Sequence, residues 1–274
     1  MNYRHAFHAG NFADVMKHLA LVAILTHLKK KPGPFAVIDT HAGRGLYDLM
    51  SDEAMRSGEA TGGIERVRGL GDGPEALRLY LDVVRSCGEA RYPGSPLIAA
   101  KLLRPEDRLV AIEKHPDDAR ALKIALAPFR RAHVVEADGY ARLPAHLPPP
   151  ERRGLILIDP PYETPDEFAA AARAVAGILR RFATGVVLVW FPIKSAAAAN
   201  AFCSEVLQYG PRKLLRVDLD TGAGGKRMAS AGLLVANPPF GFDADMRAAL
   251  DAVAPGLGHN GPARPRLDWL AGPQ

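Results

Sequence analysis

The residues that follow one short apolar run could do chemistry on an amino group. Asp159-Pro160-Pro161-Tyr162 comes directly after Leu155–Ile158. The amino group of a nucleobase is a poor nucleophile because its lone pair is delocalised into the ring. The Asp159 carboxylate and the Pro160 carbonyl could accept hydrogen bonds from its two N–H groups and draw the lone pair back to the nitrogen. Tyr162 offers a flat face on which an extruded base could stack. These four residues indicate amino methylation, although a strand followed by an ordinary Asp-Pro turn would share them.

The apolar run itself reads as a buried strand, and three similar strands precede it. We predict strands at 35–39, 108–112 and 133–136, each ending at or just before an acid: Asp39, Glu113 and Asp138. The carboxyl ends of parallel strands meet at one edge of a sheet, where ligands of α/β proteins bind. Four acids in order along the chain therefore predict one ligand site, with Asp159 as its last member.

The loop after the first strand supports a ligand at this edge. Gly43 and Gly45 let the backbone pass close to a bound molecule. Because the third glycine of the dinucleotide fingerprint is missing, nicotinamide binding is disfavoured. Glu113 is placed to accept the hydroxyls of a ribose, and Asp138-Gly139 suits an adenine amino group and its ring face.

Further strands at 185–191, 213–219 and 231–236 bring the total to seven, which predicts an α/β fold with a mostly parallel sheet. Residues 46–100 show helical spacing and interrupt the strand pattern. We therefore expect a main domain from residues 1–45 and 101–274, with an inserted helical subdomain at 46–100. Residues 1–11 form an arm, after which Asn11 caps a long helix, and Ser95 is expected to cap a helix over 97–103.

The amino-acid composition limits which kinds of protein this chain can be. The chain has 274 residues, 48% of them hydrophobic, and 35 basic against 30 acidic residues give a formal charge of +5. This mild excess is compatible with a polyanionic partner. Two cysteines, Cys87 and Cys203, make no disulfide framework. No apolar run is long enough for a membrane span, so we expect a soluble cytoplasmic protein.

Four ionisable residues near the start suggest a metal site as an alternative. Asp14 and His18 share a helix face, with His5 and His8 on the arm before them. No His-Glu-x-x-His pattern accompanies them. We expect no metal, and a metal hydrolase stays the alternative that bound zinc or manganese would indicate.

Two more segments could take part in substrate binding. Asn237-Pro238-Pro239-Phe240 repeats the pattern at Asp159, but it follows the last predicted hairpin, and we interpret it as structural. The glycine-rich loop 221–228 carries Lys226 and Arg227, which could hold RNA phosphates together with the arm and Arg152-Arg153. Arg130-Arg131 and Arg180-Arg181 are interpreted as solvated helix ends.

Taken together, these motifs resemble the RlmJ family, the bacterial 23S ribosomal RNA adenine-N6-methyltransferases. The resemblance runs from the arm to the last strand and rests on Tyr3-Arg4-His5-Ala6-Phe7-His8-Ala9-Gly10-Asn11, Ala13-Asp14-Val15, Lys17-His18, Asp39-Thr40-His41-Ala42-Gly43, Tyr92-Pro93-Gly94-Ser95-Pro96 and Arg153–Tyr162. It implies a class I, Rossmann-like methyltransferase fold with a helical insertion. It also implies S-adenosylmethionine as cofactor and an adenine of 23S rRNA as substrate.

The resemblance also implies roles for individual residues. Those expected to contact the cofactor are His18, His41, Ser95, Glu113, Asp138 and Gly139. Asp159 would be the catalytic acceptor, and the residues that help close the substrate site would be Tyr3, His5 and Lys17. The chain departs from the family pattern at Arg44, where a small residue is expected, which puts the local contacts of the glycine loop in doubt.

Other functions remain open at this stage. The same chemistry could act on DNA adenine or on a small amine, and the fold could be a non-catalytic RNA-binding module with a degenerate pocket. We expect a monomer.

Overall fold

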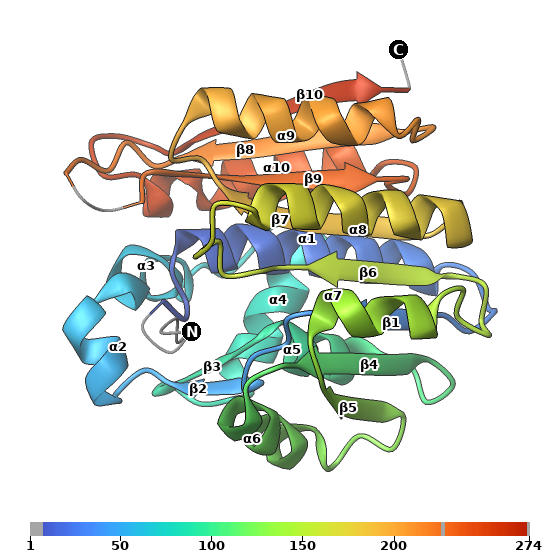
Figure 1. The fold of residues 1–274 in the computed structure, drawn as a ribbon. Helices are drawn as coiled ribbons and strands as arrows, with labels where there is room; N and C mark the ends of the chain where they lie inside the picture. Colours follow the sequence, from blue (N-terminus) through green and yellow to red (C-terminus); the bar gives the residue numbers. More distant parts are fainter. Residues whose placement is uncertain (1–7, 226–227, 273–274) are drawn as a thin grey trace.

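The computed structural model describes residues 8–225 and 228–272, and its centre is one eight-stranded sheet (Figure 1). Its strands are β1 (Ala36–Asp39), β4 (Arg108–Glu113), β5 (Ala132–Glu136), β6 (Gly154–Ile158), β7 (Val186–Pro192), β8 (Leu214–Asp220), β9 (Ser230–Ala236) and β10 (Arg264–Ala271). Their order is β10-β8-β9-β7-β6-β1-β4-β5, and β9 and β10 run antiparallel to their neighbours. The predicted mostly parallel α/β sheet is confirmed.

The sheet has eight strands rather than seven because β10 was not predicted. This strand lies in a tail rich in glycine and proline, and it contains Pro265. Proline is tolerated where a strand forms the border of a sheet, and β10 pairs only with β8 in the observed order.

Helices cover both faces of the sheet and give the molecule three layers (Figure 1). One face carries α1 (Phe12–Lys29), α5 (Ser95–Leu102), α6 (Pro116–Leu126) and α10 (Phe242–Leu257), with α4 (Glu75–Arg85) packed on α1. The other carries α7 (Gly139–Arg142), η3 (Leu143–His146), α8 (Glu167–Arg181) and α9 (Ala196–Gln208). β6 is buried along its whole length between the two layers, as its apolar sequence predicts.

Residues 46–100 contain most of the small elements. They are β2 (Leu46–Asp48), α2 (Asp52–Ser57), η2 (Glu59–Gly62), α3 (Ile64–Val67), α4, β3 (Arg91–Pro93) and α5. β2 and β3 form a separate two-stranded sheet. The buried side chains of Tyr80, Tyr92 and Ile98 belong to the same apolar cluster as those of α1. The boundaries of an inserted subdomain stay a prediction.

The N-terminal caps of two helices were predicted, and one of them is as expected. Asn11 caps α1, and its side-chain oxygen accepts a hydrogen bond of 2.9 Å from the Asp14 backbone N–H. Ser95, by contrast, is the first residue of α5 rather than its cap, which is Gly94. The Ser95 hydroxyl therefore points to a different partner, described below.

The strand register shows which residues lie at each of the two edges of the sheet. At the carboxyl edge, where the parallel strands end, Asp39 lies beside Leu157 of β6, and Glu113 lies beside Glu136 of β5. At the amino edge, where these strands begin, lie the starts of β6, β7 and β8 (Figure 1, right). Among the described residues, no helix is both long and apolar enough to cross a membrane.

The second Pro-Pro motif lies at the amino edge. Asn237 follows β9, which is antiparallel to β7, and its side-chain amide donates to the backbone oxygens of Ala183 (3.0 Å) and Gly185 (2.9 Å). The structural interpretation of Asn237 is confirmed, because these bonds hold a turn at the edge away from Asp159.

Candidate active site

A cavity of about 770 Å³ opens at the carboxyl edge of the sheet. The predicted site residues that line it are Lys17, His18, His41, Gly43, Ser95, Glu113, Asp138, Gly139 and Asp159. The described residues Pro160 and Tyr162 lie next to lining residues in the chain without lining the cavity themselves, and Gly45 lies two positions from Gly43 and Tyr47, which do line it. Tyr3, His5, Lys226 and Arg227 lie outside the described residues. The sequence therefore identified residues from six separate segments that share one cavity.

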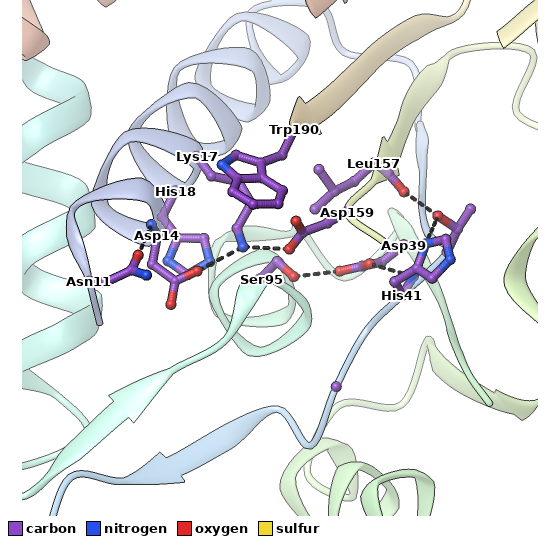
Figure 2. A network of polar contacts seen from close by, with 12 residues as sticks. Asn11, Asp14, Lys17, His18, Asp39, His41, Ser95, Leu157, Asp159 and Trp190 are labelled. Atoms are coloured by element: carbon purple, nitrogen blue, oxygen red, sulfur yellow. Dashed lines mark hydrogen bonds and ion pairs between the residues drawn. The ribbon is translucent and has the colours of Figure 1, made fainter. Parts of the chain in front are cut away.

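Asp159 is held by a buried ammonium group. The Lys17 amino group donates to Asp159 Oδ2 and, at 2.7 Å, to Asp14 Oδ1 (Figure 2). The Lys17 side chain is 4% exposed. Burial alone would lower the pKa of Lys17, but the two carboxylates outweigh it and raise that pKa above its ordinary value. Lys17 thus stays charged and connects α1 to the end of β6.

Asp14 completes this arrangement from the first turn of α1. Its Oδ2 accepts a hydrogen bond of 2.9 Å from the Gly10 backbone N–H. Gly10 has a φ of +80°, a left-handed conformation that favours glycine. The chain entering α1 is therefore tied to Lys17, and through Lys17 to Asp159.

The second oxygen of Asp159 is not used in this network. Within the described residues, Asp159 Oδ1 accepts no hydrogen bond, whereas Oδ2 accepts from Lys17. Asp159 also lines the cavity. The site therefore presents one carboxylate oxygen in a fixed orientation at the end of β6.

Tyr162 adopts a strained turn after the two prolines. Its φ is +49°, which costs a non-glycine residue of the order of 1 kcal/mol or more. Its hydroxyl donates to the Trp190 backbone oxygen at 2.8 Å, and its ring lies 4.8 Å from that of Phe168. These contacts orient Tyr162 beside the cavity, and stacking on a base stays a prediction.

Asp39 is a buried acid behind the cavity. The Ser95 hydroxyl donates to Asp39 Oδ2 at 2.7 Å, and the His41 backbone N–H donates to Oδ1 at 3.3 Å (Figure 2). Burial raises the pKa of Asp39 to about 7, with a further contribution from Asp159 and partial opposition from the Ser95 hydrogen bond. Ser95 thus joins α5 to the end of β1.

The glycine loop is attached to Glu113. The Gly43 and His115 backbone N–H groups each donate to the Glu113 carboxylate at 2.7 Å. Burial raises the pKa of Glu113 above its ordinary value, and these hydrogen bonds oppose the rise. Gly43 and Gly45 have φ values of +61° and +77°, so the turn requires glycine. The unexpected Arg44 lies with its Nε 3.2 Å from Asp118 Oδ1.

Asp138 and Gly139 form the start of α7. Asp138 caps this helix by accepting from the Ala141 backbone N–H at 3.1 Å, and it pairs with Lys114 at 3.0 Å. Although partial burial opposes ionisation, these contacts lower the pKa of Asp138 below its ordinary value. A Cβ on Gly139 would lie 2.0 Å from the Thr40 backbone oxygen. Only glycine fits between α7 and the loop after β1.

Two histidines of the cavity have assigned partners. The Thr40 hydroxyl donates to the Leu157 backbone oxygen at 2.9 Å, so it can only accept from His41 Nδ1, 2.8 Å away. Burial lowers the pKa of His41 to about 4, so the ring is neutral at pH 7 and its Nε2 is an acceptor. His18 Nδ1 lies 2.7 Å from the hydroxyl of buried Tyr92.

Some lining residues were not predicted. They are Tyr47, Lys114, His115, Asp118, Tyr140, Glu163, Asp166 and Glu167. Lys114, His115 and Tyr140 directly follow predicted residues at strand ends, so their adjacency was an available signal. Tyr47 comes from the separate β2–β3 sheet, and nothing in the sequence places that sheet beside the cavity.

His5 lies outside the described residues, and the other three residues considered for a metal site have other partners. His8 lies 2.8 Å from Glu59, Asp14 binds Lys17, and His18 contacts Tyr92. In residues 8–225 and 228–272, no group of three or more histidines, cysteines or acids has a metal-binding arrangement.

The predicted phosphate contacts of Lys226 and Arg227 lie outside the described residues and stay a prediction. The strands on either side of them end and begin at the carboxyl edge, where Asp220 of β8 pairs with Ser230 of β9. Arg152-Arg153 precedes β6 at the amino edge, and the Arg153 guanidinium donates to the backbone oxygens of Leu28 and Gly33. Arg152-Arg153 therefore lies at the edge opposite to the end of β8 and the start of β9.

The cavity fits the cofactor expected from the sequence. Its volume falls in the range of small-molecule sites. Gly139 lets α7 lie close to the loop after β1 at the cavity wall, and the Glu113 carboxylate is fixed there by two backbone N–H groups. An adenosine could use Glu113 for its ribose hydroxyls and the Asp138-Gly139 turn for its base.

Comparison with known proteins places these features in one group. Residues 32–271 match the family described as "RsmJ: Ribosomal RNA large subunit methyltransferase D, RlmJ". Ribosomal RNA large subunit methyltransferase J of Escherichia coli K12 is 40% identical over 98% of this chain and 99% of its own length, and that of Haemophilus influenzae is 36% identical over the same shares. The crystal structure of protein LPL1258 from Legionella pneumophila is 32% identical, with a TM-score of 0.87 over 95% of this chain and 98% of that one.

Proposed function

The chain belongs to the RlmJ family of ribosomal RNA large subunit methyltransferases, and from this membership we propose that it transfers a methyl group from S-adenosylmethionine to N6 of an adenine in 23S rRNA. The observation that carries the proposal is the position of Asp159. Its carboxylate lines the cavity at the end of β6, with Oδ2 held by Lys17 and Oδ1 unused within the described residues. The free oxygen can accept a hydrogen bond from the adenine amino group and so orient that group for methyl transfer.

Asp159 and Pro160 would position the adenine amino group. Asp159 Oδ1 and the Pro160 carbonyl oxygen are acceptors on adjacent residues, and each can accept a hydrogen bond from one N–H of the amino group. These two bonds turn the nitrogen lone pair away from the ring and toward the cavity. Because Lys17 fixes the carboxylate from the other side, the acceptor is oriented before the base arrives.

The residues that would hold the cofactor surround the same cavity. Glu113 would accept the ribose hydroxyls, Asp138 and Gly139 would contact the adenine, and His18, His41 and Ser95 would contact the remaining polar groups. When bound, S-adenosylmethionine supplies an electrophilic methyl group. After transfer the amine must lose one proton, and the Asp159 carboxylate is the base within reach of the nitrogen that it positions.

Several further residues were predicted to contact the RNA substrate. Lys17 is buried between two acids, which supports a role in positioning Asp159 rather than direct contact with phosphate. Tyr162 would stack on the base, with its hydroxyl bond to Trp190 setting the ring orientation. Tyr3, His5, Lys226 and Arg227 would close the site around the RNA.

Methyl transfer to protein-free 23S rRNA tests the proposal. The RNA must lack prior modification, and labelled cofactor followed by nuclease digestion identifies the product. We expect N6-methyladenosine at one position, and no transfer to duplex DNA or free nucleosides. Label on another base or atom would contradict the N6 assignment. Failure of S-adenosylmethionine to raise the melting temperature would contradict the cofactor assignment and favour a non-catalytic RNA-binding role.

A further inference from the structure

Positive charge is concentrated at the amino edge of the sheet, away from the cavity. Exposed basic residues precede most of the parallel strands that begin there: Lys31 before β1, Arg130 before β5, Arg152 before β6, Arg180 and Arg181 before β7, and Arg212 before β8. The strand register aligns these starts along one edge (Figure 1, right). We call these six residues the basic row.

The acids at this edge bond to groups outside the row, and two of them, Asp243 and Asp245, bond to Trp269 and His27 rather than to an arginine or lysine. Glu106 and Asp107 pair with Arg104, and Glu151 pairs with Arg108 at 2.8 Å. Within the described residues, no member of the basic row makes an ion pair with any of them. The row therefore adds uncompensated positive charge to the surface.

The preference of cations for the C-terminal ends of helices accounts for only some members of the basic row. Arg180 and Arg181 lie in the last turn of α8, where a cation is favoured by the helix dipole. Arg152 lies in the turn before β6 with a φ of +52°, and Arg130 and Arg212 lie four residues beyond α6 and α9. The row thus continues where no helix terminus requires it.

An exposed aromatic ring lies at the same edge. Phe240 is 93% exposed, the largest exposure among the large hydrophobic residues of the described chain. It belongs to the turn after β9, in which the Asn237 backbone N–H donates to the Lys213 oxygen, next to Arg212. A flat ring beside guanidinium groups is the combination that binds the bases and backbone of single-stranded RNA.

We propose that the basic row and Phe240 form a second RNA-binding surface, which holds a segment of ribosomal RNA outside the segment that enters the cavity. The proposal rests on the proposed function. Guanidinium groups match phosphate by paired hydrogen bonds, and five of the six members of the row are arginines. The cavity lining instead includes Glu163, Asp166 and Glu167, whose charge repels phosphates. A polyanion therefore needs an anchor elsewhere on the protein.

Binding of two RNAs tests this surface. One is protein-free 23S rRNA, and the other is a short hairpin cut from it around the methylated adenine. The test variant is Arg180→Gln with Arg212→Gln, and the control is Arg120→Gln with Arg173→Gln, two exposed arginines in the middle of α6 and α8. Both variants lose two charges, and melting temperatures establish that both are folded.

For 23S rRNA we expect the test variant to bind at least about tenfold more weakly than the parent at 0.1 M salt, with a log–log salt slope shallower by about 1.4 to 1.8. The control should change neither value comparably, and hairpin binding should be equal in all three proteins. Phe240→Ala should weaken 23S rRNA binding by about fivefold or more without changing the salt slope.

Three results would overturn the proposal. They are equal binding of 23S rRNA by parent and test variant, equal losses in the test and control variants, and a loss that is as large for the hairpin as for the whole RNA. Weakened binding to vesicles of anionic phospholipid with unchanged RNA binding would assign the row to a membrane surface instead. Because binding is measured without methyl transfer, a parent that binds 23S rRNA but does not methylate it fails the proposed function and leaves this comparison intact.

Discussion

The Lys17 ammonium is hydrogen-bonded to the Asp159 carboxylate, although 142 positions separate the two residues in the chain. Asp14 lies on the other side of the same ammonium. Both the acceptor for the substrate amine and the helix that follows the N-terminal arm therefore depend on one buried charge. Chemistry and folding stability are coupled at this point.

Removal of the Lys17 charge should destabilise the protein strongly. Lys17→Met removes the ammonium that neutralises the carboxylates of Asp14 and Asp159, and breaking a buried ion pair from one side costs about 3–5 kcal/mol. The measurement is the free energy of unfolding in urea near pH 7. Adding Asp14→Asn to Lys17→Met should recover part of the loss, because one of the two uncompensated charges is then gone. A Lys17→Met protein as stable as the parent would contradict this account of the network.

Asp159→Asn should separate binding from chemistry. The amide can still accept one hydrogen bond, but it carries no charge and cannot accept the proton that the amine loses. We expect methyl transfer to fall by about a hundredfold or more, while the cofactor raises the melting temperature as in the parent. Asp159→Ala with full turnover would remove Asp159 from the mechanism.

Asp39 and His41 should make the free energy of unfolding depend on pH in opposite directions, so that each effect hides the other. The folded-state pKa of Asp39 is raised to about 7, so the folded protein keeps a proton that the unfolded chain loses, and stability falls as pH rises from about 4 to 7. The folded-state pKa of His41 is lowered to about 4, so stability rises with pH from about 4 to 6.5. Each effect amounts to about 3–4 kcal/mol. In the parent they largely cancel.

Single substitutions should reveal the two effects. Unfolding free energies of Asp39→Asn, measured in urea from pH 4 to 8, should rise by about 3 kcal/mol up to pH 6.5, because Asp39 then no longer offsets the effect of His41. Those of His41→Gln should fall by about 4 kcal/mol up to pH 7. Ser95→Ala removes a hydrogen bond that lowers the pKa of Asp39, so the loss should extend above pH 7. Profiles parallel to that of the parent would contradict the assignments.

Much of the site could be predicted because it uses local signals. An apolar run that ends in an acid marks the carboxyl end of a buried strand, and the four acids Asp39, Glu113, Asp138 and Asp159 follow from this rule. Their convergence then follows from the parallel sheet alone.

The remainder depends on long-range packing that no local pattern encodes. The Lys17–Asp159 bond and the Ser95–Asp39 bond each join segments that meet only in the folded chain. β10 was missed because glycine and proline around Pro265 indicate a tail, whereas pairing with β8 is a tertiary contact.

Gly139 should not tolerate a methyl group. In Gly139→Ala the added Cβ would meet the Thr40 backbone oxygen at 2.0 Å, so α7 or the loop after β1 must move. We expect a loss of stability of about 1–3 kcal/mol and weaker cofactor binding. Gly177→Ala is the matched control, since Gly177 lies inside α8 and a Cβ added there would meet no atom within 4 Å, and it should be neutral or stabilising by up to about 1 kcal/mol. Unchanged cofactor affinity in Gly139→Ala would remove this turn from the binding site.

Tyr162 has two roles to separate, because its hydroxyl bonds to Trp190 while its ring is predicted to stack on the base. Tyr162→Phe keeps the ring and should cost about 1 kcal/mol of stability with little effect on transfer. Tyr162→Ala removes the ring, and loss of base stacking should raise the KM for RNA about fivefold or more. Phe168→Leu is the control for packing, because Phe168 contacts the ring without lining the cavity. If Tyr162→Ala and Phe168→Leu both lower kcat and leave KM unchanged, the ring acts by supporting the turn at Asp159, since a displaced acceptor slows transfer without weakening RNA binding.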